Sequence, residues 1–545
     1  MFNNSPKFKE AYVAPLLRAA LGTVLLLSGA VALDAEACTT AIITKGASAD
    51  GNTYVTHSND TFSSNPSIVY VPAHNYPKGS LRPVYPSAIA WEDYPEFNCY
   101  TTPRLVAPER TPSYASTTHK VTLPLGYIPQ VEHTYAYLDS DYAIMNEQGL
   151  MLGECTNNGA TCEYLAPVKG KNLFYASELG RVALERCTKA REAVELMGKL
   201  IDTYGIWGTG ETILVADKEE GWVLEMQPDP SGKGFWIAQR VPDGEFFVAS
   251  NIFRIRDIRL GSKDQLFNPQ LPEQLQKAGL AVVNPASGLV DWVSSIKTVE
   301  DFHPYFALRR IWRVQQLVAP SQQLSAKVSG PTTKAYPFAV RPDKPLGIKE
   351  IFKLHRDHMQ GTELDLAKGS NAGLFQSPYR YKAEESFERS INYAKTGYTW
   401  IAQSQGAIAT PLCWLALSTP RDNVFVPFVV SDMPESYTKV DRKNYDPQKM
   451  WWTATRVDQL AKGYYSILSP TVLAQAEALE QKSLDLLHKN KALPKERLAK
   501  LLRQNAAENQ QIWEKLFGDL LVQLNQGAGV KHVEGTVKAD NVEQY

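Results

Sequence analysis

Cys38 follows the tripeptide Ala35-Glu36-Ala37, and this junction is the part of the sequence whose residue types suggest chemistry. A small-x-small tripeptide is the pattern that a signal peptidase cleaves. Cleavage after Ala37 would make Cys38 the first residue of the mature chain. The free α-amine of such a cysteine has a pKa of about 7.7–8.0, so it can take the proton of its own thiol near neutral pH. The junction therefore predicts a nucleophile that carries its own base.

The residues before the junction have the features of an export signal. Lys7, Lys9 and Arg18 precede an uncharged run, residues 19–33, which is rich in Leu, Ala and Val. A membrane span needs about 20 apolar residues, and this run is shorter than that. We predict that residues 1–37 are a signal peptide and that the mature chain has no membrane span. The predicted location is periplasmic or extracellular, with attachment to the cell surface as an alternative.

Two other roles of Cys38 stay open at this stage. The residue can be half of a structural disulfide, or it can be the lipidated cysteine of an exported lipoprotein. Glu36 fits a lipoprotein signal poorly, because a small neutral residue is usual there. Lipidation would consume both the thiol and the amine, so a lipidated protein would be non-catalytic.

The composition excludes several classes of function. The 545 residues include 57 basic and 58 acidic side chains, and the net charge of −1 gives no footprint for binding nucleic acid. The six cysteines contain no CxxC pair, although Cys155 and Cys162 are placed to form a bridge or to stay reduced. His355 and His358 lack the companion motifs of a metal site, and no phosphate-binding loop occurs. We predict no metal and no cofactor.

Several segments carry a family resemblance. Residues 38–60 read as two strands joined by a turn that contains Gly and Asp. Further motifs are MNEQGL at 145–150, FFVASNIFR at 246–254 and RDHMQGTELDL at 356–366. Together with the opening cysteine, they resemble the cysteine dipeptidase family of N-terminal-nucleophile (Ntn) hydrolases. That family is related to the secernins and, more distantly, to penicillin V acylases and conjugated bile salt hydrolases.

The resemblance runs from Cys38 to about residue 460 and implies an α+β fold, the four-layer αββα sandwich of Ntn hydrolases. The stretch 65–129 departs from the family pattern. After residue 460, leucines recur at helical spacing on both sides of Pro494. We therefore predict a catalytic domain at 38–460, a C-terminal helical hairpin at 461–526 and a loose tail at 527–545. The hairpin is expected to pack on the catalytic domain or to form a homo-oligomer with a second subunit.

Two further stretches predict elements of the catalytic domain. The apolar residues of 173–204 have the spacing of an amphipathic helix. Residues 396–420 carry no charge, but they contain Gln, Pro, Thr and Ser, so they predict strands of a buried sheet and not a membrane span.

The resemblance also implies roles for particular residues. Cys38 would supply the nucleophilic Sγ, and Asp60 would bind its α-ammonium or orient the thiol. Asn251 would donate its side-chain amide to the oxyanion, and Asn157 is a second candidate donor. Arg310 is similar to an arginine that supports the active site in the acylases.

Neighbouring residues leave some of these assignments open. Arg309 and Arg313 lie on the same helical segment as Arg310, and any of the three can be surface charge. His57 is expected to be an exposed histidine on a strand.

The predicted function is an exported cysteine-type dipeptidase that acts on a small peptide substrate through an acyl-enzyme on Cys38. The alternative within the same machinery is an N-acyl amide hydrolase. A dipeptidase needs a polar anchor for the charged ends of its substrate. Candidate anchors are Glu154, Glu225 and the cluster from Arg309 to Arg313.

Overall fold

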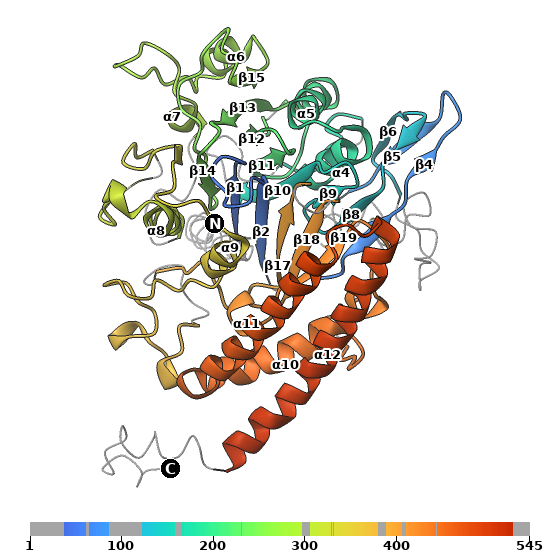
Figure 1. Ribbon diagram of the computed structural model, residues 1–545. Coiled ribbons are helices and arrows are strands. Elements are labelled where there is room, and N and C mark those ends of the chain that lie inside the picture. The colour runs from blue at the N-terminus through green and yellow to red at the C-terminus, as the bar shows by residue number, and fades with distance from the viewer. Residues whose placement is uncertain are drawn as a thin grey trace, which may run out of the picture. The chain divides into compact units, whose positions relative to one another are not determined.

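The two strands predicted at the opening cysteine lie at the centre of a seven-stranded antiparallel sheet (Figure 1). β1 (Ala37–Ile43) and β2 (Tyr54–Asp60) pair as a hairpin, as predicted. β1 is rich in β-branched residues, and β2 begins with Tyr, Val and Thr; both types of residue favour extended backbone. The strand order is β16, β14, β1, β2, β17, β18, β19. The remaining strands are β14 (Phe246–Ala249), β16 (Ala339–Val340), β17 (Tyr398–Gln403), β18 (Leu412–Leu417) and β19 (Val426–Val429), so the strands predicted within 396–420 are also confirmed.

A second, eight-stranded antiparallel sheet contains the MNEQGL motif. Gly149, at φ +85°, makes the tight turn of this motif in a conformation that favours glycine. The strand order is β15, β13, β12, β11, β10, β9, β8, β3. Their bounds are β3 (Val69–Val71), β8 (Tyr137–Asp139), β9 (Met145–Asn146), β10 (Met151–Asn157), β11 (Gly210–Ala216), β12 (Gly221–Gln227), β13 (Phe235–Val241) and β15 (Gln265–Phe267).

The two sheets pack face to face, with β10 against β1 and β2. Ile42 and Val55 of the first sheet share one buried core with Met151 and Leu214 of the second. Gly153 of β10 allows a close approach, because a Cβ atom there would lie 2.7 Å from Oγ1 of Thr40 in β1. The opening cysteine therefore lies near the start of a strand that is covered by the second sheet.

Helices cover the outer faces of both sheets. α4 (Ala176–Arg186) and α5 (Ala190–Tyr204) pack on the eight-stranded sheet, and α8 (Leu308–Val318) and α9 (Ile348–His355) pack on the seven-stranded one. The single helix predicted at 173–204 is wrong, because the backbone is extended at Cys187 (φ −111°, ψ 152°) and divides it into two. Two short helices, α6 (Leu271–Lys277) and α7 (Trp292–Ile296), pack beside β13. The chain is thus a mixed helix and sheet protein.

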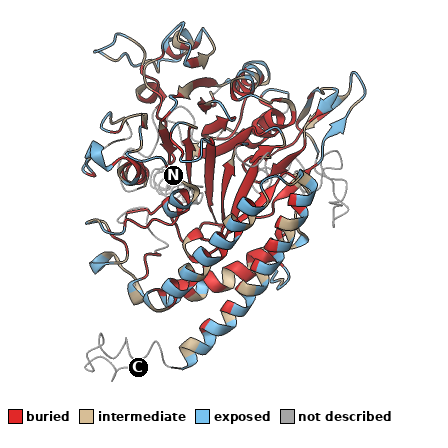
Figure 2. Ribbon diagram, in the orientation of Figure 1, coloured by how far each residue is buried: buried red, intermediate tan, exposed pale blue. Residues whose placement is uncertain are grey.

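Three helices follow the sheets: α10 (Met450–Gly463), α11 (Tyr465–Lys489) and α12 (Lys495–Asn525). α11 and α12 run antiparallel, with their outer faces exposed (Figure 2), and Asn505 donates to Ser483 across them at 3.0 Å. The domain boundary predicted at residue 460 falls inside α10, whose apolar side chains belong to the same core as both sheets. Arg356 of the RDH motif binds Glu480 of α11 in a buried ion pair, which ties this helix to the sheets.

The structure is a computed structural model that describes the following residues: 37–61, 65–86, 123–157, 165–168, 170–229, 231–296, 306–328, 330, 332–379, 388–405, 410–442 and 444–526. The predicted signal peptide, except for residue 37, and the predicted tail lie outside these ranges. Part of the stretch 65–129 forms two small two-stranded sheets, β4 (His74–Asn75) with β7 (His133–Thr134) and β5 (Leu81–Val84) with β6 (Gly126–Pro129). Within the described ranges, no helix combines the length and apolarity needed to cross a membrane.

We expect Gly153→Ala to destabilise the protein by about 1–3 kcal/mol, because the added methyl group would force β10 away from β1 and β2. Gly518→Ala in α12 is the matched control, because no atom lies within 4 Å of its added Cβ and alanine favours a helix. The free energy of unfolding in denaturant should fall in the first variant and stay level or rise in the second. Equal effects would contradict the tight packing of the two sheets.

Candidate active site

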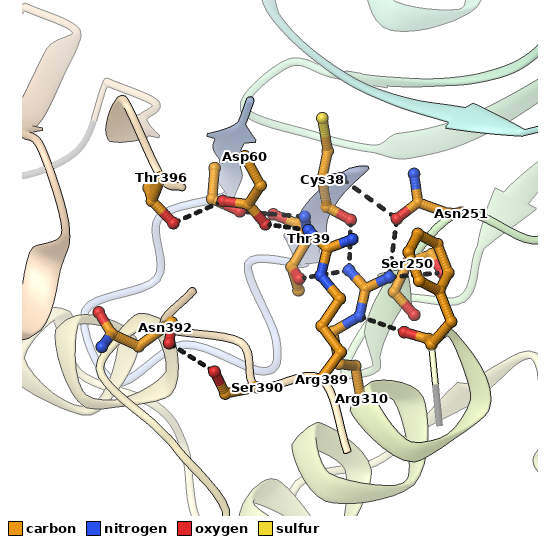
Figure 3. Close-up of polar contacts among 12 residues, drawn as sticks. Cys38, Thr39, Asp60, Ser250, Asn251, Arg310, Arg389, Ser390, Asn392 and Thr396 are labelled. Atoms are coloured by element: carbon orange, nitrogen blue, oxygen red, sulfur yellow. Dashed lines mark hydrogen bonds and ion pairs between the residues drawn. The ribbon is translucent and has the colours of Figure 1, made fainter. Parts of the chain in front are cut away.

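Cys38 is the second residue of β1, and its side chain is fully buried. Successive side chains of a strand point to opposite faces, so Cys38 shares a face with Ile42, which lies in the core between the sheets. Figure 3 shows its Sγ pointing away from Arg310. On the neighbouring strand, Asp60 pairs with Ala37, the residue before Cys38. The thiol therefore faces the second sheet, while Asp60 lies beside the residue that would be removed.

The guanidinium group of Arg310 holds the backbone around Cys38 (Figure 3). Its Nη1 donates to the carbonyl oxygen of Cys38 at 2.8 Å and to Oγ1 of Thr39 at 3.0 Å. Its Nη2 donates to Oδ1 of Asn251 at 2.7 Å, and its Nε donates to the carbonyl oxygen of Phe306 at 2.7 Å. Arg310 is fully buried, so these donors meet acceptors that have little access to water.

The other two candidate arginines of this helix have different partners. Arg309 forms an ion pair with Glu388 at 3.2 Å, and Arg313 forms one with Asp357 of the RDH motif at 2.7 Å. Arg310 is therefore the one of the three that contacts Cys38. All three arginines are largely buried. Their spacing along the helix therefore could not show which of them contacts Cys38.

Asn251 connects Cys38 to both sheets. Its Oδ1 accepts the backbone N–H of Cys38 at 3.2 Å, and its Nδ2 donates to the carbonyl oxygen of Thr156 in β10 at 2.7 Å. Asn251 has φ +67°, a left-handed conformation that asparagine tolerates better than most residues. The side-chain oxygen of Asn251 thus holds the nitrogen of Cys38, while donation from its amide to an oxyanion stays a prediction.

Asp60 lies on the opposite face of the hairpin from the thiol. Its carboxylate accepts Nη2 of Arg389 at 2.9 Å and Oγ1 of Thr396 at 2.7 Å. Burial raises the pKa of Asp60, and the positive charge of Arg389 opposes that rise. Sequence reasoning missed Arg389, and only the general rule that a buried carboxylate needs a cation could have suggested such a partner.

Asn157 and Cys155 lie near the end of β10. The Nδ2 of Asn157 donates to Oγ1 of Thr212 at 2.6 Å, a contact within the second sheet and not with Cys38. Cys155 is a buried thiol whose Sγ accepts the N–H of Asn251 at 2.7 Å. The alternative of a bridge to Cys162, which lies outside the described residues, is therefore not realised at Cys155.

His57 and Glu154 surround the sulfur of Cys38. The Sγ lies 3.9 Å from Oε2 of Glu154, and Nδ1 of His57 hydrogen-bonds to the carbonyl oxygen of Glu154 at 2.9 Å. The expectation of an exposed His57 is wrong, because the side chain is fully buried against the second sheet. Burial lowers the pKa of His57 to about 4 and raises the pKa of Glu154 to about 7.

These three side chains are also where the described residues could hold a metal ion. One donor atom from each of Cys38, His57 and Glu154 lies within 4.8 Å of the others, and all three are atom types that bind zinc. The same arrangement places a thiol, a neutral imidazole and a carboxyl group around one buried point. It therefore sets a candidate nucleophile beside two groups that can exchange protons.

A family model described as "Peptidase family C69" matches residues 37–478. A probable dipeptidase of Latilactobacillus sakei is 23% identical over 462 residues, covering 82% of this chain and 86% of that protein. A probable dipeptidase B of Lactococcus lactis subsp. lactis (strain IL1403) is 25% identical over 305 residues, covering 53% of this chain. The chain spans 58% of the length of the Lactococcus protein.

Among solved structures, a mutant of the conjugated bile acid hydrolase from Clostridium perfringens is similar to this chain. The alignment covers 75% of this chain and 97% of that one, at 13% sequence identity and a TM-score of 0.31. That score is too low to establish a shared fold.

We expect Arg310→Lys to lower the free energy of unfolding by about 2–4 kcal/mol, because a lysine cannot reproduce the planar fork that joins Cys38 to Asn251. Arg497→Lys, at an exposed position of α12, is the matched control and should change stability by less than about 0.5 kcal/mol. Both values come from denaturant titration. A loss in Arg310→Lys no larger than in the control would contradict the role of the fork.

The buried imidazole of His57 predicts a stability that depends on pH. The unfolded histidine takes up a proton near its ordinary pKa of about 6.5, whereas the folded one stays neutral down to a pKa of about 4. As the pH falls from about 7.5 to about 5, the wild-type protein should lose about 2 kcal/mol of stability relative to His57→Gln. His74→Gln removes an exposed histidine and serves as the control. Parallel pH curves for wild type and His57→Gln would contradict the burial of a neutral imidazole.

Proposed function

We propose that this chain, which belongs to peptidase family C69 and is a cysteine peptidase, hydrolyses dipeptides with the Sγ of Cys38 as nucleophile. The observation that carries the proposal is the clamp on Cys38. Arg310 and Asn251 fix the carbonyl oxygen and the nitrogen of one residue whose thiol faces a buried polar site. The named relatives that match the chain are dipeptidases or probable dipeptidases, which favours this activity over N-acyl amide hydrolysis.

The mechanism requires a mature chain that begins at Cys38. In that chain the nitrogen that donates to Asn251 would be the free α-amine, and Asp60 would lie on β2 opposite the place of the removed Ala37. The amine takes the thiol proton, and Sγ attacks the peptide carbonyl carbon. The amine then returns the proton to the leaving nitrogen, the C–N bond breaks and a thioester to Cys38 remains. Water, activated by the same amine, hydrolyses the thioester and restores the thiol.

Polar groups near the sulfur would stabilise the transition state electrostatically. A donor for the tetrahedral oxyanion stabilises the charge that develops on the carbonyl oxygen. We propose the amide of Asn251 for this role, through the N–H that is not directed at Thr156, because Asn251 also contacts Cys38. Asn157 is the weaker candidate, because its amide donates to Thr212 within the second sheet. Arg310 acts as a positioning residue, since its contacts are with the backbone of Cys38 and the side chain of Asn251.

Several other features belong to the same proposal. Residues 1–37 would be the signal peptide, and the protein would act after export. The two packed sheets with helices on their outer faces support the four-layer αββα arrangement of Ntn hydrolases. Association through the C-terminal helices also stays a proposal, and the exposed Leu521 and Val522 of α12 are where it can be probed. Membership of a peptidase family speaks against a non-catalytic lipoprotein.

We expect Cys38→Ala to lower kcat/KM for dipeptides by more than about a thousandfold while the protein stays folded. Cys413→Ala removes another buried cysteine of the same core and should retain turnover. The measurement is amino-acid release from a panel of dipeptides, with N-acyl amides assayed in parallel. Residual activity of Cys38→Ala within about tenfold of wild type would remove Cys38 as the nucleophile, and preference for N-acyl amides would favour the amidase.

A further inference from the structure

The carboxyl group beside the nucleophile is not isolated. Glu154 of β10 and Glu211 of β11 lie on one face of adjacent strands, since Glu211 pairs with Thr156. Both are buried, and their carboxyl groups are close enough to share one proton. Thr156 also donates its Oγ1 to Oε1 of Glu154 at 2.9 Å. Two carboxyl groups thus share a buried place next to the sulfur of Cys38.

Glu154 itself has no cationic side chain as a partner among the described residues. The groups that contact its carboxyl are the thiol of Cys38, the hydroxyl of Thr156 and the carboxyl of Glu211, and none of them carries a positive charge. The neighbouring imidazole of His57 is fully buried, and its Nδ1 is engaged by the carbonyl oxygen of Glu154. Arg310 directs its donors at the backbone of Cys38 and at Asn251. A buried carboxylate without a cation is costly, so the site is complementary to a positively charged ligand.

The imidazole of His57 separately favours a ligand that donates N–H groups. Its Nδ1 faces the carbonyl oxygen of Glu154, which only accepts, so a neutral ring carries its proton on Nδ1. The other nitrogen, Nε2, is therefore an acceptor, and it is fully buried with no hydrogen-bond partner among the described residues. A ring nitrogen of His57 lies within 4.8 Å of the sulfur and of a carboxylate oxygen. The imidazole that borders the site therefore carries an unsatisfied acceptor nitrogen.

The distance to the nucleophile matches one group of a dipeptide. A sulfur poised for attack lies about 3–3.5 Å from the carbonyl carbon, and the α-nitrogen is two covalent bonds from that carbon, at about 2.5 Å. A carboxylate oxygen 3.9 Å from Sγ can then hydrogen-bond to that nitrogen. The carboxylate of the same dipeptide is farther from the reacting bond and carries the wrong charge for this place.

We propose that Glu154, supported by Glu211 and His57, binds the free α-ammonium group of the residue whose carbonyl Cys38 attacks. Peptides with an unblocked amino terminus are then substrates, and N-acylated peptides are excluded. This inference rests on the proposed dipeptidase function and specifies how the active site selects its substrate.

The other candidate anchors have partners that occupy them. Glu225 accepts the backbone N–H groups of Arg254 and Ile255 and the Nε1 of Trp292, so it fixes the chain after Asn251. Arg309 and Arg313 form the ion pairs described above.

The test compares two substrates that differ by the ammonium group alone, Ala-Leu and its desamino analogue propionyl-Leu. We expect the wild-type enzyme to prefer Ala-Leu by at least about a hundredfold in kcat/KM. Glu154→Gln should reduce this preference by at least about tenfold, through a higher KM for Ala-Leu alone. Glu195→Gln, at an exposed position of α5, is the matched control and should leave both values unchanged.

Several outcomes separate this inference from the proposed function. Equal turnover of the two substrates by the wild type would overturn the inference, even if Glu154→Gln failed to fold. An equal loss of kcat on both substrates in Glu154→Gln would also overturn it, because that pattern indicates a base or a structural role. Glu154→Asp, which keeps the charge, should retain part of the preference. A wild-type enzyme that cleaves no dipeptide of the panel would instead overturn the proposed function.

Discussion

The fork of Arg310 is the interaction on which the site depends, because it joins segments that are far apart in the sequence. One helix residue binds the carbonyl oxygen of Cys38 at the start of β1 and the side chain of Asn251 after β14. Asn251 in turn accepts a hydrogen bond from the nitrogen of Cys38 and donates one to Thr156 of the second sheet. Arginine keeps its charge and its planar shape when buried, so the backbone of the nucleophile is oriented before a substrate arrives.

The parts of this account that the sequence could supply are local or depend on the family resemblance. Residue types alone predict the hairpin near Cys38, and the Ala35-Glu36-Ala37 junction predicts a free amine on that cysteine. The position of His57 could not be inferred, because its burial depends on β10, 97 residues further along the chain. Nor could the partner of Asp60, because Arg389 is 329 residues away. Such contacts are set by the packing of two sheets and not by a local pattern.

The environment of the thiol differs in charge on its two sides. On one side, arginines hold the backbone of Cys38 and the carboxylate of Asp60. On the other side, Glu154 and a neutral His57 face the sulfur. This separation keeps the positive groups engaged with fixed acceptors and leaves the acidic side for a ligand. A peptide with a free amino terminus would present its cation to the acidic side and its scissile carbonyl to the sulfur.

The central claim is that Cys38 acts with its own α-amine as base, and the most direct test is to change only what precedes it. Two preparations are compared, one whose intact mass shows a chain starting at Cys38 and one that retains Ala37. We expect dipeptide turnover and a thioester adduct on Cys38 only in the first. Equal turnover by the chain that retains Ala37 would contradict the claim, because a peptide nitrogen cannot accept the thiol proton.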